Sequence, residues 1–180
     1  LNCTRRMEEA IERAKSLGDS LGGIVECHAL NVPVGVGEPF FDSLDADIGK
    51  LLFDIPAVKG VEFGLGFKAS ELTGSENNDA YAIKDGKIVT LTNNAGGILG
   101  GLSTGMPIVV KAAFKPTSSI PREQKTVNLE KMREEVIQVK GRHDPCVVPK
   151  AAPVVESGVA IVLADHMLRG GYIPKVLLRR

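Results

Sequence analysis

The feature that most constrains this chain is a glycine-rich run at residues 92–119 that leads into an apolar strand and ends in a polar cluster. The run is nearly neutral and contains Gly96, Gly97, Gly100, Gly101 and Gly105. Glycine lacks Cβ, so its backbone can take a positive φ or approach a ligand closely. The strand predicted over 108–114 is followed by Lys115, Pro116, Thr117, Ser118 and Ser119. A cation with several hydroxyl donors at a strand end suits a phosphate or another oxyanion.

Two familiar nucleotide-binding motifs do not fit the glycine-rich run. The segment GGILGGLSTG lacks the lysine of a P-loop, and it does not open a helix after a strand as a dinucleotide-binding motif does. The glycines could instead serve close packing between strands. Lys115 could likewise extend to the surface beside an ordinary turn. The residues alone leave an anion site and a purely structural role both open.

Length, charge and cysteine content limit the class of protein. The chain has 180 residues, enough for one domain with a substantial core, and its net charge is zero. Zero net charge argues against nucleic-acid binding through bulk charge. Three scattered cysteines without metal-ligand spacing predict a reduced, cytoplasmic protein. The longest apolar stretches are shorter than the roughly 20 residues of a membrane span, so no membrane partner is expected.

Hydrophobic periodicity predicts a mixture of helices and strands. Helices are predicted over 5–17, 41–55, 130–135 and 151–169, with Asp42 as a cap for the second and Pro153 in the first turn of the last. The apolar residues of the last helix nearly encircle its axis, which is typical of a buried helix between layers. Strands are predicted over 22–31, 57–63, 108–114 and 136–140, with a hairpin over 81–91 that turns at Asp85-Gly86. The tail over 172–180 is expected to be frayed or a terminal strand. The pattern predicts a layered α+β domain.

A second polar cluster is the triplet Arg142, His143 and Asp144. The neighbouring arginine should keep the carboxylate ionised, and the imidazole could pass protons. An ordinary ion pair in a turn is the simpler explanation. His166 lies near the end of the last predicted helix, where the helix dipole favours a positive charge, so a cap role and not catalysis is expected for it.

Several ordered motifs resemble the chorismate synthase family. They are NNAGGILGGLSTGMPI, FKPTSSI, GRHDPCVVPKAAPVVESGVAIVLADHML and the upstream VGVGEPFFDSLDADIGKLLFDIPAVKGVEFGLGF, and together they span nearly the whole chain. The resemblance implies a lyase that removes phosphate from 5-enolpyruvylshikimate 3-phosphate by 1,4-anti elimination to give chorismate. It also implies reduced FMN as cofactor and a homotetramer. The expected fold is a layered β-α-β sandwich of antiparallel sheets around long buried helices, incomplete in this chain.

The resemblance also implies roles for individual residues. Contacts to FMN fall on Pro56, Ala57, Gly100, Lys115, Pro116, Thr117, Ser118 and Ser119. Arg142 would lie between flavin and substrate, and Asp144 would lie near flavin N5 for proton transfer. Some family members carry asparagine where this chain has Pro56, so a contact of that side chain would be lost here, whereas a contact of the backbone carbonyl would remain.

Other family motifs are absent from this sequence. The family's ESHG histidine, its second catalytic histidine and its arginine-rich stretch ending in SARET are not found. The chain starts at Leu1 next to a predicted helix, so we expect the C-terminal half of a longer protein, with an incomplete cofactor site and no turnover on its own. The alternative is a non-catalytic flavin-binding or assembly module that retains the fold.

Overall fold

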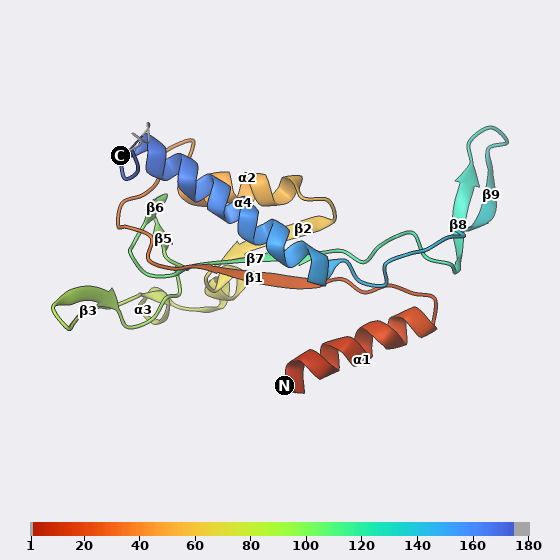
Figure 1. Ribbon diagram of the computed structural model, residues 1–180, viewed down its shortest axis with the longest axis horizontal. Coiled ribbons are helices and arrows are strands. Elements are labelled where there is room, and N and C mark those ends of the chain that lie inside the picture. Colours follow the sequence, from red (N-terminus) through yellow and green to blue (C-terminus); the bar gives the residue numbers. More distant parts are fainter. Residues whose placement is uncertain (1, 175–180) are drawn as a thin grey trace, which may run out of the picture.

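The computed structural model describes residues 2–174, and its centre is a three-stranded antiparallel sheet (Figure 1). The strand order is β1-β7-β2, formed by β1 (Gly23–Ala29), β7 (Ile108–Phe114) and β2 (Val58–Phe63). Burial alternates along β7, so that Ile108, Val110, Ala112 and Phe114 are buried on one face. The sequence predicts all three strands because each is a short β-branched or apolar run bounded by glycine or proline.

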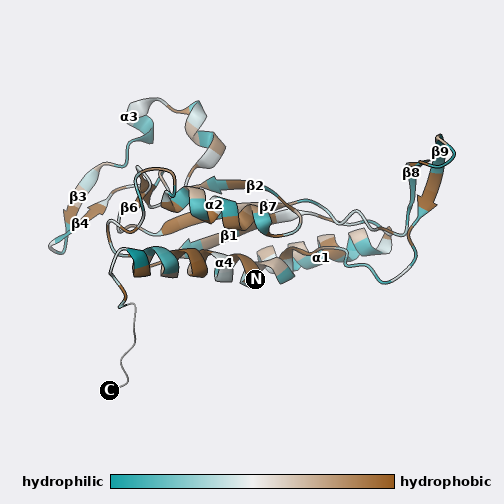
Figure 2. Ribbon diagram, turned by 90° about the horizontal axis from the view of Figure 1, so that it is seen from above, coloured by the Kyte–Doolittle hydropathy of each residue, from teal (hydrophilic) through white to brown (hydrophobic). Residues whose placement is uncertain are grey.

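Two helices cover the buried face of this sheet. In α2 (Leu44–Asp54), Leu44, Ile48 and Leu52 recur every four residues and are fully buried. In α4 (Val148–Arg169), the buried residues include Val155 and Val159. Figure 2 shows apolar residues along the sheet strands beneath these helices. The α+β class predicted from the sequence is confirmed, and the described residues form a sheet layer and a helix layer.

Several smaller elements lie around this core. They are α1 (Asn2–Ser16), the 3-10 helix η1 (Gly66–Glu71), α3 (Gly74–Asn77), and the hairpins β3–β4 (Tyr81–Lys84, Lys87–Thr90), β5–β6 (Ile98–Leu99, Leu102–Ser103) and β8–β9 (Glu123–Asn128, Arg133–Gln138). The predicted Asp85-Gly86 turn is confirmed, with positive φ at both residues. The β8–β9 hairpin projects from the body as an arm (Figure 1).

The helix predicted over 130–135 is wrong, because this segment is the tip of the β8–β9 arm and part of β9. The side-chain oxygen of Asn128 accepts hydrogen bonds from the backbone N–H groups of Glu130 and Lys131, at 3.1 and 2.9 Å. This side-chain turn reverses the chain. Met132 then takes a positive φ of 46°, and β9 starts at the next residue.

Helix boundaries also differ from the sequence prediction. The N-cap of α2 is Ser43 and not Asp42. Helix α4 starts at Val148, so Pro149 occupies its first turn and Pro153 lies inside the helix. The earlier start follows from the tolerance of the first helical turn for proline, whose missing N–H would have no partner there. Most of the predicted tail lies outside the described residues, but the Tyr172 hydroxyl donates to the Val34 carbonyl at 2.9 Å.

Helix α4 is buried along one face only. Val154 and Ile161 are 49% and 62% exposed, although the apolar residues encircle the helix. By length and composition α4 could cross a membrane, but such a single helix is weak evidence, and α4 packs on α2 and β1 as a core helix does. The prediction that α4 is buried between two layers therefore holds for only one of its faces within residues 2–174.

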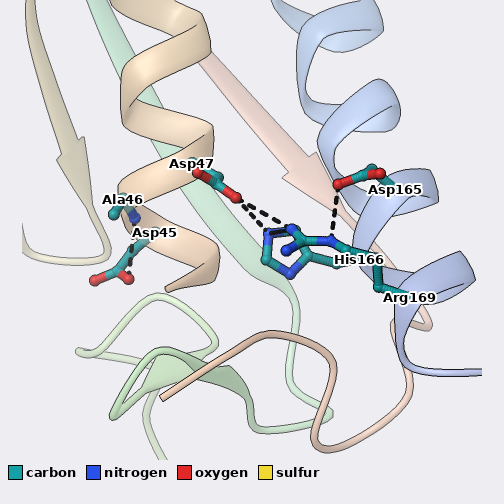
Figure 3. Close-up of polar contacts among 6 residues, drawn as sticks. All are labelled: Asp45, Ala46, Asp47, Asp165, His166 and Arg169. Carbon is teal, nitrogen blue, oxygen red and sulfur yellow. Dashed lines mark hydrogen bonds and ion pairs between the residues drawn. The ribbon is translucent and has the colours of Figure 1, made fainter. Parts of the chain in front are cut away.

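A polar cluster joins α2 to the last turns of α4 (Figure 3). His166 is 2% exposed, and its Nε2 lies 2.9 Å from the Asp47 carboxylate and 3.0 Å from Arg169. Nε2 can donate to Asp47 or accept from Arg169, but one nitrogen cannot do both. Arg169 also pairs with Asp47 at 3.2 Å and with Asp165 at 3.0 Å. The His166 side chain is thus buried in the core and joins α4 to α2, and it does not cap the end of α4 as the sequence predicts.

Replacing Asp47 should therefore loosen the contact between the two helices. We expect Asp47→Ala to lower the free energy of unfolding by about 1–2 kcal/mol, because both His166 and Arg169 lose a charged partner. Asp165→Ala is the matched control, since Asp165 is exposed and its pair with Arg169 is worth up to about 0.5 kcal/mol. Urea denaturation of both variants measures the difference, and equal losses would contradict the role of Asp47.

Candidate functional site

A pocket of about 440 Å³ opens where β2, β7 and the start of α4 meet. It is lined by Ile55, Pro56, Ala57, Phe114, Lys115, Pro116, Thr117, Ser118, Val147, Lys150 and Ala151. The volume lies within the roughly 300–1,000 Å³ of small-molecule sites. The lining is largely apolar with a few polar groups, which is also typical of such sites. Six of the residues implied to contact FMN lie together here.

Backbone pairing between β2 and β7 brings the two predicted cofactor segments together. The Lys115 N–H donates to the Ala57 carbonyl at 2.9 Å, one residue beyond the pairing of Val58 with Phe114. Ala57 has a φ of 74°, an uncommon and costly conformation for a residue with Cβ. Pro56 and Ala57 therefore form one wall of the pocket, beside the segment that starts at Lys115.

Thr117 provides the clearest sign that a polar ligand fits this pocket. Its Oγ1 is buried and has no hydrogen-bond partner among the described residues. Its backbone carbonyl accepts a hydrogen bond from the Ser20 hydroxyl at 2.6 Å, which fixes the segment in place. A buried hydroxyl without a partner is destabilising, so it marks a position where a ligand atom can complete the bonding.

Asp144 lies beside the pocket and is joined to it by Lys150. The Lys150 Nζ lies 2.7 Å from Asp144 Oδ2, and Lys150 itself lines the pocket. The hydrogen bond and charge of Lys150 lower the pKa of Asp144, with a smaller contribution from the charge of Arg142. The residue after Asp144 is held by the segment that leads into β1, because the Leu21 N–H donates to the Pro145 carbonyl at 2.8 Å. Asp144 thus pairs with Lys150, and not with Arg142 as a simple ion pair in a turn would have it.

Gly100, Ser119 and Arg142 do not line the pocket. Gly100 lies in the β5–β6 turn with a φ of 58°. The neighbouring Gly101 carbonyl accepts a hydrogen bond from the Leu44 N–H at 3.0 Å, at the first residue of α2. The pocket lies at the other end of α2, where Ile55 follows its last residue. At about 1.5 Å per residue, the length of α2 separates Gly100 from the pocket by roughly 16 Å.

Sequence reasoning missed five residues that line the pocket: Ile55, Phe114, Val147, Lys150 and Ala151. The four apolar ones carry no chemical signal. Lys150 does carry one, because it is the third residue of α4, where the helix dipole disfavours a cation. Placing the start of the helix at 151 concealed that signal.

The glycine-rich run is held in place by Asp79. Its carboxylate accepts hydrogen bonds from the Thr92 hydroxyl at 2.6 Å and from the N–H groups of Asn94 and Ala95, at 2.7 and 2.9 Å. Burial raises the pKa of Asp79, but these three hydrogen bonds outweigh it and the net effect lowers the pKa. The loop before β3 is thus tied to residues 92–95.

Comparison with known proteins decides the family. The family model for chorismate synthase matches residues 2–168. The chain belongs to the chorismate synthase family. It is 61% identical over 163 residues to the chorismate synthase of Thermococcus kodakarensis, covering 91% of this chain and 46% of that protein.

The chain is also similar to other members of the chorismate synthase family. The chain is 54% identical over 177 residues to the chorismate synthase of Dehalococcoides mccartyi, covering 98% of this chain and 49% of that protein. A crystal structure of chorismate synthase matches the fold with a TM-score of 0.74 at 35% identity, covering 92% of this chain and 43% of the other. This chain spans about half the length of the curated relatives that it matches.

The unpaired hydroxyl of Thr117 gives a test of ligand fit. We expect Thr117→Val to leave the free energy of unfolding unchanged or slightly higher, because it removes a buried polar atom without a partner. If the ligand is FMN, as the resemblance implies, Thr117→Val should weaken its binding by roughly 3–10-fold, the worth of one hydrogen bond. Flavin-fluorescence titration and urea denaturation measure the two effects. Thr126→Val, on the exposed arm, is the control and should change neither, whereas unchanged FMN binding by Thr117→Val would exclude a bond from this hydroxyl.

The lowered pKa of Asp79 predicts a pH-dependent contribution to stability. Because the folded state favours the ionised form, this contribution is present above the ordinary pKa of about 3.9 and is lost as pH falls through the lowered pKa. We expect Asp79→Asn to cost about 1 kcal/mol at pH 7 and to match the unsubstituted chain below both pKa values. Asp85→Asn in the exposed hairpin turn is the control. A stability difference that does not change with pH would contradict this account.

Proposed function

We propose that this chain forms the flavin-binding wall of a lyase that converts 5-enolpyruvylshikimate 3-phosphate to chorismate and phosphate. The observation that carries the proposal is the convergence of Pro56, Ala57 and the segment 115–118 on one pocket, with Asp144 one ion pair away. These residues come from three separate stretches of the sequence. Family membership supplies the reaction, because the relatives are named chorismate synthase.

The residues of the pocket fit reduced FMN. The apolar lining around Ile55, Ala57 and Val147 suits a flat ring, and the orphaned Thr117 hydroxyl offers a hydrogen bond. Lys115 and Ser118 offer a cation and a hydroxyl to an anionic group. When bound, reduced FMN would supply the electron-rich group that this elimination requires without net oxidation or reduction. Gly100, Ser119 and Arg142 stay in the proposed contact set on the resemblance alone.

The chain's own polar residues would divide the remaining work. Lys115 and the hydroxyls of the 117–119 segment would bind and orient anionic groups. Arg142 would offset the negative charge of a phosphorylated dicarboxylate substrate. A carboxylate oxygen of Asp144 would accept the proton that leaves the substrate as the phosphate departs, so that one C–H bond and one C–O bond are replaced by a new C=C bond.

We further propose that the 180-residue chain alone does not turn over substrate. The motifs with the family's catalytic histidines are absent from this sequence. Apolar side chains such as Met7, Leu17, Val154 and Ile161 are 49–64% exposed on α1, just beyond it, and on α4. Exposed apolar surface of this kind marks contact with further protein. The working form would be a cytoplasmic homotetramer of the longer protein.

Replacing Lys115 tests the flavin site directly. We expect the chain to bind FMN and Lys115→Met to weaken binding roughly 10–100-fold, because a charge-assisted hydrogen bond contributes about 1.5–3 kcal/mol. Lys125→Met, on the exposed β8 strand, is the control and should bind as the unsubstituted chain does. Flavin-fluorescence titration measures binding, and equal affinities for the two variants would contradict the assignment of Lys115.

A steady-state assay tests the claim about turnover. With reduced FMN and 5-enolpyruvylshikimate 3-phosphate, we expect the isolated chain to release neither chorismate nor phosphate. Appreciable chorismate would refute the claim that this chain lacks part of the catalytic site. Flavin binding without turnover is also what a non-catalytic flavin-binding module would show. Turnover by the longer protein, abolished by Asp144→Asn, would separate the enzyme from such a module.

A further inference from the structure

Lys150 stands between the candidate pocket and Asp144 and faces both. It is the third residue of α4 and belongs to the pocket lining together with Lys115 and Ser118. Its Nζ nevertheless makes its hydrogen bond to Asp144 Oδ2, at 2.7 Å. The Lys150 side chain therefore contacts a carboxylate outside the pocket and belongs to the lining of the pocket itself.

The ion pair makes Asp144 a weaker proton acceptor than a carboxylate without a cation beside it. Lys150 lowers the pKa of Asp144 through a hydrogen bond and through charge, and Arg142 adds a smaller effect in the same direction. A general base works best when its pKa lies near the working pH. The pairing seen in the structure therefore opposes the role in proton transfer that the proposed function gives to Asp144.

The pair is also weak enough to exchange partners. The side chains of Lys150 and Asp144 are 70% and 46% exposed. An ion pair at this exposure contributes little stability, because water screens the charges and two flexible side chains must be ordered. An anionic oxygen held in the pocket by Lys115 and the neighbouring hydroxyls would compete for the Lys150 ammonium through a charge-assisted hydrogen bond.

We propose that Lys150 is a positioning residue that exchanges Asp144 for a phosphate group in the pocket, and so frees Asp144 to accept a proton only when ligand is bound. This inference rests on the proposed function, because it needs Asp144 as the proton acceptor. The phosphate belongs either to FMN or to the phosphorylated substrate, which present the same chemistry to an ammonium group. Without ligand, Lys150 stabilises the ionised form of Asp144 and so disfavours proton transfer to it.

The test follows the Asp144 carboxyl by ¹³C NMR across pH in the 180-residue chain. The probes are FMN, riboflavin, which lacks the phosphate, and inorganic phosphate, with sodium chloride at matched ionic strength as control. We expect a phosphate-bearing probe to raise the Asp144 pKa, and riboflavin and chloride to leave it unchanged. A shift with FMN assigns the cofactor phosphate to Lys150, and a shift with inorganic phosphate alone assigns the substrate phosphate.

Variants separate positioning from a merely structural role. Lys150→Met should raise the Asp144 pKa without ligand, abolish the further shift and weaken binding of the active probe roughly 3–10-fold. Lys150→Arg should restore the ligand-dependent shift, and Lys125→Met on the arm should behave as the unsubstituted chain. Since Lys150 is exposed, the variants should fold, which circular dichroism checks.

The outcomes distinguish this inference from the proposed function. If FMN binds and no probe moves the Asp144 pKa, the exchange is refuted while the flavin site stands. If FMN does not bind and inorganic phosphate still moves the pKa, the exchange stands and the flavin assignment fails. An Asp144 pKa that is the same in Lys150→Met as in the unsubstituted chain overturns the inference outright.

Discussion

The structure depends on the antiparallel pairing of β7 with a strand on each side. Residues 108–114 alternate between a buried and a partly exposed face, so the same seven residues supply the core beneath α2 and α4 and the hydrogen bonds to both neighbours. Where the pairing with β2 ends, the Lys115 N–H still reaches the Ala57 carbonyl. The position of every residue on that side of the pocket follows from this register, because a shift by one residue would turn each side chain to the other face.

Much of the fold could be predicted from the sequence, because local patterns determine it. The four-residue spacing of Leu44, Ile48 and Leu52 predicts α2, and Asp85-Gly86 predicts the turn of the β3–β4 hairpin. The helix prediction over 130–135 is wrong because the Asn128 side chain accepts hydrogen bonds from two backbone N–H groups and so stabilises a turn, although the composition of the segment favours a helix. The predicted start of α4 is wrong because the sequence offers two prolines, Pro149 and Pro153, and either could occupy the first turn of a helix.

The candidate site could be predicted only in part. The residue types from Lys115 to Ser118 indicate an anion-binding site in the sequence alone. Pro56 and Ala57, which lie beside them, were predicted only from the family resemblance. Lys150 could not be predicted as a site residue, because its role follows from the 2.7 Å distance between its Nζ and Asp144 Oδ2 and from its place in the pocket lining. The orphaned hydroxyl of Thr117 is likewise a property of burial and not of sequence. Residues that act together here are brought together by strand pairing and by the start of one helix.

The central claim is that one pocket at the end of β7 binds the flavin. Amide chemical-shift mapping of the 180-residue chain during addition of FMN tests it most directly. The account predicts that the largest shifts fall on Ala57, on residues 115–118 and on residues 147–151, with the exposed arm at 123–138 unaffected. Saturable FMN binding with its largest shifts elsewhere, or no binding at all, would contradict it.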